Sequence, residues 1–153
     1  MMKKLLTFLS LSALLAATAA AHCQIPCGIY DDAARITEMK EHVTTIEKSM
    51  KEIAALKPDS AQNINQLTRW VNNKELHADQ LTEIVTYYFM AQRIKPDAAQ
   101  YDAKLKTLHA IMIECMKAKQ TVDQAHVAKL RTLISEFEHL YIGHDAMAHD
   151  HAH

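Results

Sequence analysis

The chain has 153 residues, of which 49% are hydrophobic and 23% charged, a composition typical of one globular domain and unlike that of a disordered chain. Its formal net charge of −1 gives no excess of positive charge for binding nucleic acid. Two glycines and three prolines are too few for the frequent turns of an all-β sandwich or barrel. The composition therefore favours a fold of long helices. The chain also has ten histidines, eight methionines and three cysteines, which raise the question of a transition metal because these side chains are ligands of soft and borderline metals.

The first 21 residues have the features of a secretory signal peptide. Lys3 and Lys4 form a positive n-region, residues 5–17 are mostly apolar, and residues 18–21 offer a small-residue cleavage site. The apolar run is too short to span a membrane. We therefore expect cleavage after Ala21, which gives an exported protein, periplasmic or secreted, that keeps no membrane anchor.

Residues 22–30 then form the start of the mature chain and are rich in metal ligands. A metal there meets the α-amine and imidazole of His22, the backbone nitrogen and thiolate of Cys23, and the thiolate of Cys27. The amine, the amide nitrogen and the first thiolate close two small chelate rings, and such a planar set of nitrogen and sulfur donors suits Ni(II) or Cu(II) better than Zn(II). The alternative is a disulfide between the two cysteines, because exported proteins occupy oxidising compartments. A disulfide needs neither a histidine before the first cysteine nor a cleavage site before that histidine.

The rest of the mature chain predicts an all-α protein, an antiparallel four-helix bundle over residues 31–143. Apolar residues recur at steps of three and four, and two Lys-Pro-Asp stops separate neighbouring segments. The helices are expected over residues 31–56, 61–93, 98–119 and 121–143. We expect a kink or break at Asn72-Asn73 and a left-handed cap at Gly143. The apolar residues expected to face the core from the second helix include Ile64, Leu67, Val71, Leu81, Ile84, Val85, Tyr88 and Phe89.

The pattern H-C-x-x-P-C-G-x-Y at residues 22–30 resembles the nickel hook of nickel-dependent superoxide dismutases, whose members are four-helix bundles assembled as homohexamers. Residues 64–72 and 88–94 are also similar to members from marine bacteria and cyanobacteria. The resemblance implies one nickel ion per subunit. Its ligands are the α-amine and axial imidazole of His22, the amide nitrogen and thiolate of Cys23, and the thiolate of Cys27.

The resemblance also implies an activity. The enzyme converts superoxide to dioxygen and hydrogen peroxide by cycling between Ni(II) and Ni(III), and Tyr30 is a catalytic residue that stands over the open face of the metal. Strongly donating thiolates and an anionic amide are needed because they bring the nickel potential into a useful range.

Two features depart from the family pattern. Gln24 stands where several members carry an acidic residue. The family also holds the axial imidazole with a glutamate on the first helix that an arginine supports. Here Thr37 takes the glutamate position with Glu38 beside it, and Arg69 matches the arginine. These three residues are the candidates for orienting the imidazole of His22.

Residues 144–153 form a tail that is expected to be disordered and that carries four histidines: His144, His149, His151 and His153. The tail is either an accessory metal-collecting segment or a frayed terminus in solvent. Glu136 and His139 have the spacing of a di-iron ligand pair, but no second copy of that motif exists in the sequence. Cys115 is expected to be buried. Surface or packing roles are expected for the helical histidines His42, His77, His109 and His126.

Two other functions stay open on the residues alone. The chain is compatible with an exported His- and Met-rich protein that binds nickel or copper without turnover. It is also compatible with a structural bundle that carries a Cys23–Cys27 disulfide. The expected partners of the enzyme are superoxide and further copies of the same chain, with no nucleic acid.

Overall fold

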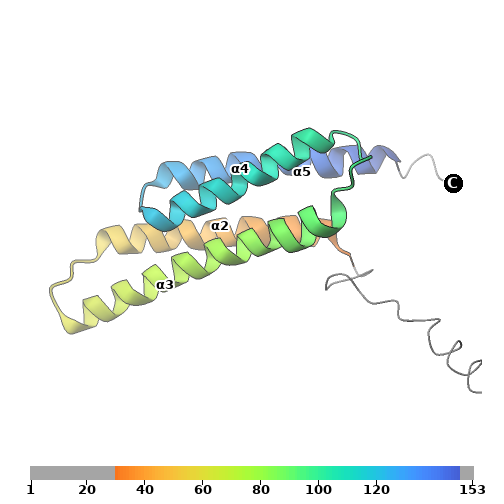
Figure 1. The fold of residues 1–153 in the computed structure, drawn as a ribbon. Coiled ribbons are helices and arrows are strands. Elements are labelled where there is room, and N and C mark those ends of the chain that lie inside the picture. Colours follow the sequence, from red (N-terminus) through yellow and green to blue (C-terminus); the bar gives the residue numbers. More distant parts are fainter. Residues whose placement is uncertain (1–29, 149–153) are drawn as a thin grey trace, which may run out of the picture.

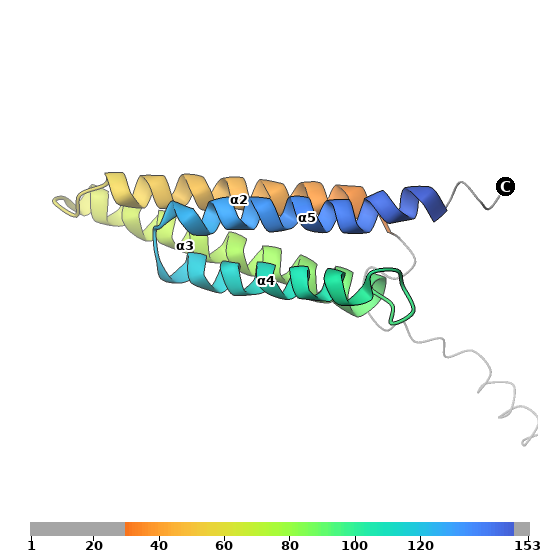
Figure 2. The same cartoon turned by 90° about the horizontal axis from the view of Figure 1, so that it is seen from above.

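The computed structural model describes residues 30–148, with side chains described for residues 30–143. Its elements are α2 (Asp32–Ala55), α3 (Ala61–Glu83), the π-helix η1 (Ile84–Arg93), α4 (Tyr101–Gln120) and α5 (Gln124–Ala148). Each helix packs against the next along the chain, and α5 returns to pack against α2 (Figures 1 and 2). The predicted antiparallel four-helix bundle is confirmed. None of the described helices has both the length and the apolar character that a membrane span requires.

Helices α2 and α3 begin at polar side chains that accept hydrogen bonds from the first turn. Asp31 Oδ1 accepts a hydrogen bond from the Ala34 N–H (2.9 Å), and Ser60 Oγ accepts one from the Asn63 N–H (3.2 Å). Each bond satisfies a backbone donor that has no partner within its own helix. At the other end of α2, the backbone of Leu56 is extended, since proline at position 58 disfavours continuation of the helix.

The predicted break at Asn72-Asn73 is wrong, because α3 runs through both residues. The Asn73 amide donates to Ser49 Oγ on α2 (3.0 Å), so it is engaged between helices and does not compete for the backbone of its own helix. The irregularity comes later, at Ile84, where the π-helix begins. The Ile94 N–H, at the end of η1, donates to the Phe89 carbonyl five residues back (2.9 Å).

Three helix ends also differ from the prediction. Helix α4 begins at Tyr101 rather than 98, because Gln100 has a left-handed φ of 57°. Helix α5 begins at Gln124, after an extended Thr121. The predicted cap at Gly143 is wrong, since α5 continues through it to Ala148. No proline follows Gly143 to end the helix, and alanines at positions 146 and 148 favour its continuation.

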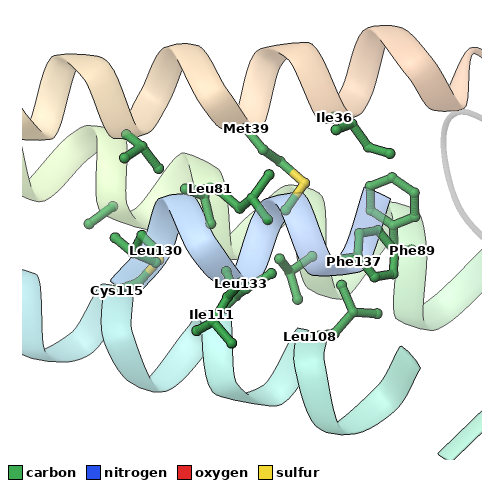
Figure 3. Close-up of a cluster of buried hydrophobic side chains, with 14 of the residues drawn as sticks. Ile36, Met39, Leu81, Phe89, Leu108, Ile111, Cys115, Leu130, Leu133 and Phe137 are labelled. Atoms are coloured by element: carbon green, nitrogen blue, oxygen red, sulfur yellow. The ribbon is translucent and has the colours of Figure 1, made fainter. Parts of the chain in front are cut away.

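The core is a continuous apolar layer to which every helix contributes (Figure 3). An aromatic group fills one part of it: the ring centroids of Phe89 and Phe137 are 4.8 Å apart, and Phe137 stacks on Tyr141 at 5.4 Å. The predicted inward positions Ile64 and Val71 are wrong, with 52% and 39% of their surface exposed. The α2–α3 hairpin extends beyond the α4–α5 connection (Figures 1 and 2), so the first half of α3 has no helix to cover that face.

Candidate functional site

The predicted nickel ligands His22, Cys23 and Cys27 lie outside the described residues, as do Gln24 and the tail residues His149, His151 and His153. His144 falls within α5, but its side chain is not among those described. The described chain starts at Tyr30, directly before α2, so the part of the candidate site that can be built is the end of the bundle that carries this residue.

Tyr30 is fixed by two side chains of η1 although 40% of its surface is exposed. The guanidinium carbon of Arg93 lies 4.3 Å from the centre of its ring, and Tyr88 meets the ring edge-on with centroids 5.9 Å apart. Cation–π and edge-to-face contacts of this kind each contribute about 0.5–1.5 kcal/mol. They restrain the ring of Tyr30 while leaving part of it accessible to solvent.

Asp32 is the acceptor that joins the elements at this end of the bundle. Its carboxylate receives hydrogen bonds from the Tyr88 hydroxyl (2.6 Å) and the Tyr141 hydroxyl (2.9 Å). Arg93 adds a fork, with Nε 2.9 Å from Oδ1 and Nη2 2.6 Å from Oδ2. The donors come from η1 and α5, so one carboxylate in the first turn of α2 ties three elements together beneath Tyr30. We call Tyr30, Asp32, Tyr88, Arg93 and Tyr141 the Tyr30 frame.

The charges of this frame are fixed near neutral pH. Burial opposes ionisation of Asp32, but hydrogen bonds from Arg93, Tyr88 and Tyr141 outweigh it and hold the pKa of the carboxyl below its usual value. Burial and the bond to Asp32 raise the pKa of the Tyr88 phenol well above its usual value. The same carboxylate raises the pKa of Arg93. Asp32 is therefore an anion, Arg93 a cation and Tyr88 a neutral donor.

The π-helix explains how two residues of one helix reach the same carboxylate. Tyr88 and Arg93 are five residues apart and lie within η1. In an α-helix, residues five apart point about 140° away from each other, because each residue turns the chain by about 100°. Hydrogen bonds of the i→i+5 type bring such residues toward one side of the helix. The change of helix type at Ile84 thus places both donors on Asp32.

The three residues predicted to orient the His22 imidazole are not brought together. The Thr37 hydroxyl donates to the Ala33 carbonyl of its own helix (3.0 Å), and Glu38 is paired with Arg35 (2.6 Å). Arg69 is exposed on α3 and lines a groove of about 690 Å³ with Lys48 and Trp70. The α2 residues of that groove begin at position 44, at least six residues beyond Glu38, or about 9 Å along the helix. Among the described residues, Arg35 rather than Arg69 supports Glu38.

The pairing of His42 with His77 could not be predicted from the sequence, because the two residues lie on different helices with no common motif. In the structure their Nδ1 atoms are 2.8 Å apart. Burial lowers the pKa of both rings. For His42 the neighbouring His77 adds to the effect, and Glu38 and Glu41 oppose it. His42 is buried, with 8% of its surface exposed.

Two other sequence predictions concern Cys115 and the Glu136–His139 pair. Cys115 is buried in the core, as predicted, and burial raises the pKa of its thiol to about 12. Glu136 accepts a hydrogen bond from Thr107 (3.3 Å). Across the described residues, no three His, Cys, Asp or Glu side chains gather in a group that could hold a metal ion. The predicted ligands precede that part of the chain.

Comparison with known proteins supplies the family. The search of curated proteins and that of solved structures returned no match. The family model described as nickel-containing superoxide dismutase matches residues 17–145, a span that includes the predicted hook, the Tyr30 frame and nearly all of the bundle. The match covers most of the chain, and the described part has the helical fold that the resemblance implies. The chain therefore belongs to the nickel-containing superoxide dismutase family, and it is an oxidoreductase that uses nickel.

Proposed function

We propose that the mature chain begins at His22 and dismutates superoxide at a nickel ion held by His22, Cys23 and Cys27, with the Tyr30 frame beside it. The observation that carries this proposal is the attachment of Tyr30, eight residues after His22, to Arg93 and through it to Asp32. A residue restrained in this way gives the preceding segment a fixed point on the bundle.

The chemistry of the predicted donor set fits nickel. Two thiolates, an amine, an anionic amide nitrogen and an imidazole combine soft sulfur with nitrogen donors, which square-planar or tetragonal Ni accepts. Bound nickel supplies a one-electron couple that takes an electron from one superoxide ion and gives it to the next. The two thiols must stay reduced until the metal arrives, because free thiolates are oxidised readily.

The described residues can bind and orient superoxide or a water molecule beside the hook. The partly exposed Tyr30 places a phenol hydroxyl, which is both donor and acceptor, at the end of the bundle from which the hook departs. There it can donate a hydrogen bond to an oxygen of superoxide or to a water molecule. The positive guanidinium of Arg93 lies against the same ring, and Asp32 keeps that guanidinium in place.

We also propose that the enzyme is a homo-oligomer, a hexamer by resemblance to the family. The projecting part of the α2–α3 hairpin supports an assembly, because it exposes Ile64 (52%) and Val71 (39%), which lie seven residues apart on one face of α3. Apolar side chains clustered on a polar surface are typical of interaction sites. Light scattering of the purified protein gives the oligomeric state, and Val71→Glu should reduce it if this face joins the subunits.

Three measurements on the exported protein test the main proposal. Mass spectrometry should show a chain that starts at His22 with free thiols, metal analysis should give one nickel ion per subunit, and a superoxide assay should show activity that Cys27→Ser abolishes. Fractionation of cells should place the protein in the periplasm or the medium. Stoichiometric nickel without dismutation would favour the alternative of a nickel-binding protein. A Cys23–Cys27 disulfide in active protein would contradict the ligand set.

A further inference from the structure

Two histidines of neighbouring helices face each other with the same ring nitrogen. The Nδ1 atoms of His42 on α2 and His77 on α3 are 2.8 Å apart, and the ring planes are tilted by 55°. Because burial lowers the pKa of both rings, both imidazoles are neutral at neutral pH, and one hydrogen lies between the two nitrogens. Neutral imidazole is also the form of histidine that binds a metal ion.

The distance between the two nitrogens suits a metal ion that binds both. An ion about 2.0–2.1 Å from each nitrogen holds them about 2.9 Å apart when the two bonds meet at a right angle, and about 3.3 Å apart at the tetrahedral angle. The observed 2.8 Å is close to the first of these and about half an ångström short of the second. The torsion that turns a histidine ring about its Cβ–Cγ bond is soft, so a rotation of each ring points both lone pairs at one ion.

The second ring nitrogen of His42 has surroundings that are typical of a metal ligand. With a metal on Nδ1, the ring carries its hydrogen on Nε2, which is buried without a hydrogen-bond partner among the described residues and lies 4.0 Å from Glu38 Oε1. Histidines that bind metals usually donate this second hydrogen to a carboxylate, a carbonyl or water. Glu38 and Glu41 are the acidic groups that act on His42, and their negative charges favour a cation nearby.

Water reaches the pair from the side of His77, which is only partly buried. The groove of about 690 Å³ between α2 and α3 includes Thr45, three residues from His42, and Leu76, next to His77. Its end is therefore within about one helical turn of both rings. Two imidazoles do not close the coordination of a metal ion, so water molecules from this side supply the remaining ligands.

We propose that His42 and His77 bind a second metal ion, a divalent transition ion, through their Nδ1 atoms, with water as the remaining ligands. Zn(II), Cu(II) and Ni(II) accept imidazole, whereas Mg(II) and Ca(II) prefer oxygen ligands. When the ion binds, the hydrogen between the rings leaves Nδ1 and water supplies one to Nε2 of the same ring, so both imidazoles stay neutral. The ion links α2 to α3, and its site is separate from the predicted nickel ligands and independent of the proposed function.

The test uses nickel-loaded, full-length protein and Zn(II) as the probe. Titration calorimetry counts the Zn(II) ions bound per chain, and thermal unfolding is recorded with and without Zn(II). His42→Gln and His77→Gln each remove one ligand, whereas His109→Gln, the control, changes an exposed histidine on α4. The wild type and the three variants carry the same histidine tail, so any Zn(II) that binds there is common to all of them.

We expect the wild type and His109→Gln to bind one Zn(II) ion more per chain than either variant of the pair. Zn(II) should also raise the unfolding temperature of the wild type and of His109→Gln by several degrees, because an ion that binds only the folded chain stabilises it. The same addition should leave the unfolding temperature of His77→Gln unchanged.

Equal Zn(II) binding by all four proteins would overturn the proposal. Loss of an ion in only one variant of the pair would also overturn it, since it would show that a single histidine binds the metal. An unfolding temperature of the wild type that does not respond to Zn(II) would show that no ion links α2 to α3. If His42→Gln does not fold, the less buried His77→Gln carries the test. Lack of dismutation by the nickel-loaded wild type would instead contradict the proposed function and leave this site untouched.

Discussion

Arg93 stands between Tyr30 and Asp32. Its guanidinium carbon lies 4.3 Å from the centre of the Tyr30 ring, while Nη2 is 2.6 Å from Asp32 Oδ2. One cation thereby links the residue before the first helix to a carboxylate that also holds Tyr88 and Tyr141. The position of Tyr30 is therefore set by Tyr88 and Arg93, which lie 58 and 63 residues further along the chain, and not only by its neighbours in sequence.

Replacing Asp32 with Asn should weaken both the fold and the activity. The change leaves the Arg93 charge partly buried without its partner and removes hydrogen bonds to a charged group, each of which is worth about 1.5–3 kcal/mol. We expect a loss of about 1–3 kcal/mol in the free energy of unfolding and a drop of about ten- to hundredfold in dismutation rate, because Tyr30 is no longer held in place. Urea unfolding and a superoxide assay measure the two effects.

The control for this variant is Asp102→Asn, in the first turn of α4, where the aspartate is exposed. This control should stay within about 0.5 kcal/mol of the wild type, as most surface substitutions do, and should keep full activity. Equal effects of the two substitutions would show that Asp32 has no special role in the site.

The free energy of unfolding should decrease as the pH falls through the range in which His42 and His77 take up protons. The pKa values of His42 and His77 are lowered in the folded protein from 6.5, so the unfolded chain binds more protons below about pH 6.5. Their contribution to stability is thus fully present above that pH and is lost as the pH decreases from it. Urea unfolding between about pH 8 and 5 measures this loss, which the double variant His42→Gln/His77→Gln should reduce and His109→Gln should not. An unchanged slope in the double variant contradicts the assignment.

Asp32 should give a second, separate acid transition. Its pKa is lowered in the folded protein from 3.8, so its contribution is present above about pH 4 and is lost as the pH falls further. Unfolding curves between about pH 5 and 2 should therefore be flatter for Asp32→Asn than for the wild type. If both proteins lose stability at the same rate in this range, the carboxylate is not held by the frame as described.

Substitutions in the core should lower the free energy of unfolding more than substitutions on the projecting part of the α2–α3 hairpin. Phe137 is fully buried against Phe89 and Tyr141, whereas Ile64 is 52% exposed. We expect Phe137→Ala to cost about 3–5 kcal/mol, the usual loss for a buried aromatic ring. Ile64→Ala should cost about 0.5 kcal/mol or less in the monomer. Thermal unfolding of both variants, at several concentrations, also shows whether the cost of Ile64→Ala rises with assembly.

The histidine tail should matter only when nickel is scarce. Removal of residues 149–153 deletes His149, His151 and His153 and leaves α5 complete to Ala148. We expect the shortened enzyme to have full activity in excess nickel and a lower nickel content when the metal is limiting, because the tail no longer collects ions. Equal nickel content of the two proteins in limiting metal would remove the accessory role predicted for the tail.

The sequence predicts the bundle well because its signals are local. The heptad of α2, with Ile36, Met39, Val43, Ile46 and Met50 all buried, can be read from spacing alone. The Tyr30 frame cannot be read in this way. Asp32 looks like one of two acidic residues at a helix start, and its donors are 56, 61 and 109 residues away. The π-helix that aligns two of these donors, Tyr88 and Arg93, has no signature in the composition. The exposure of Ile64 could not be predicted either, because it depends on where the neighbouring helices end.

If nickel is bound through the α-amine of an N-terminal His22 and the amide nitrogen of Cys23, a residue added before His22 must disrupt the site. The direct test inserts one glycine between Ala21 and His22, confirms the new first residue by mass spectrometry, and measures nickel content and dismutation. An alanine added after His153 is the control. We expect the control to keep its nickel and its activity, whereas the inserted glycine removes the α-amine ligand and abolishes dismutation. Undiminished activity of the glycine variant would show that the α-amine of His22 is not a nickel ligand.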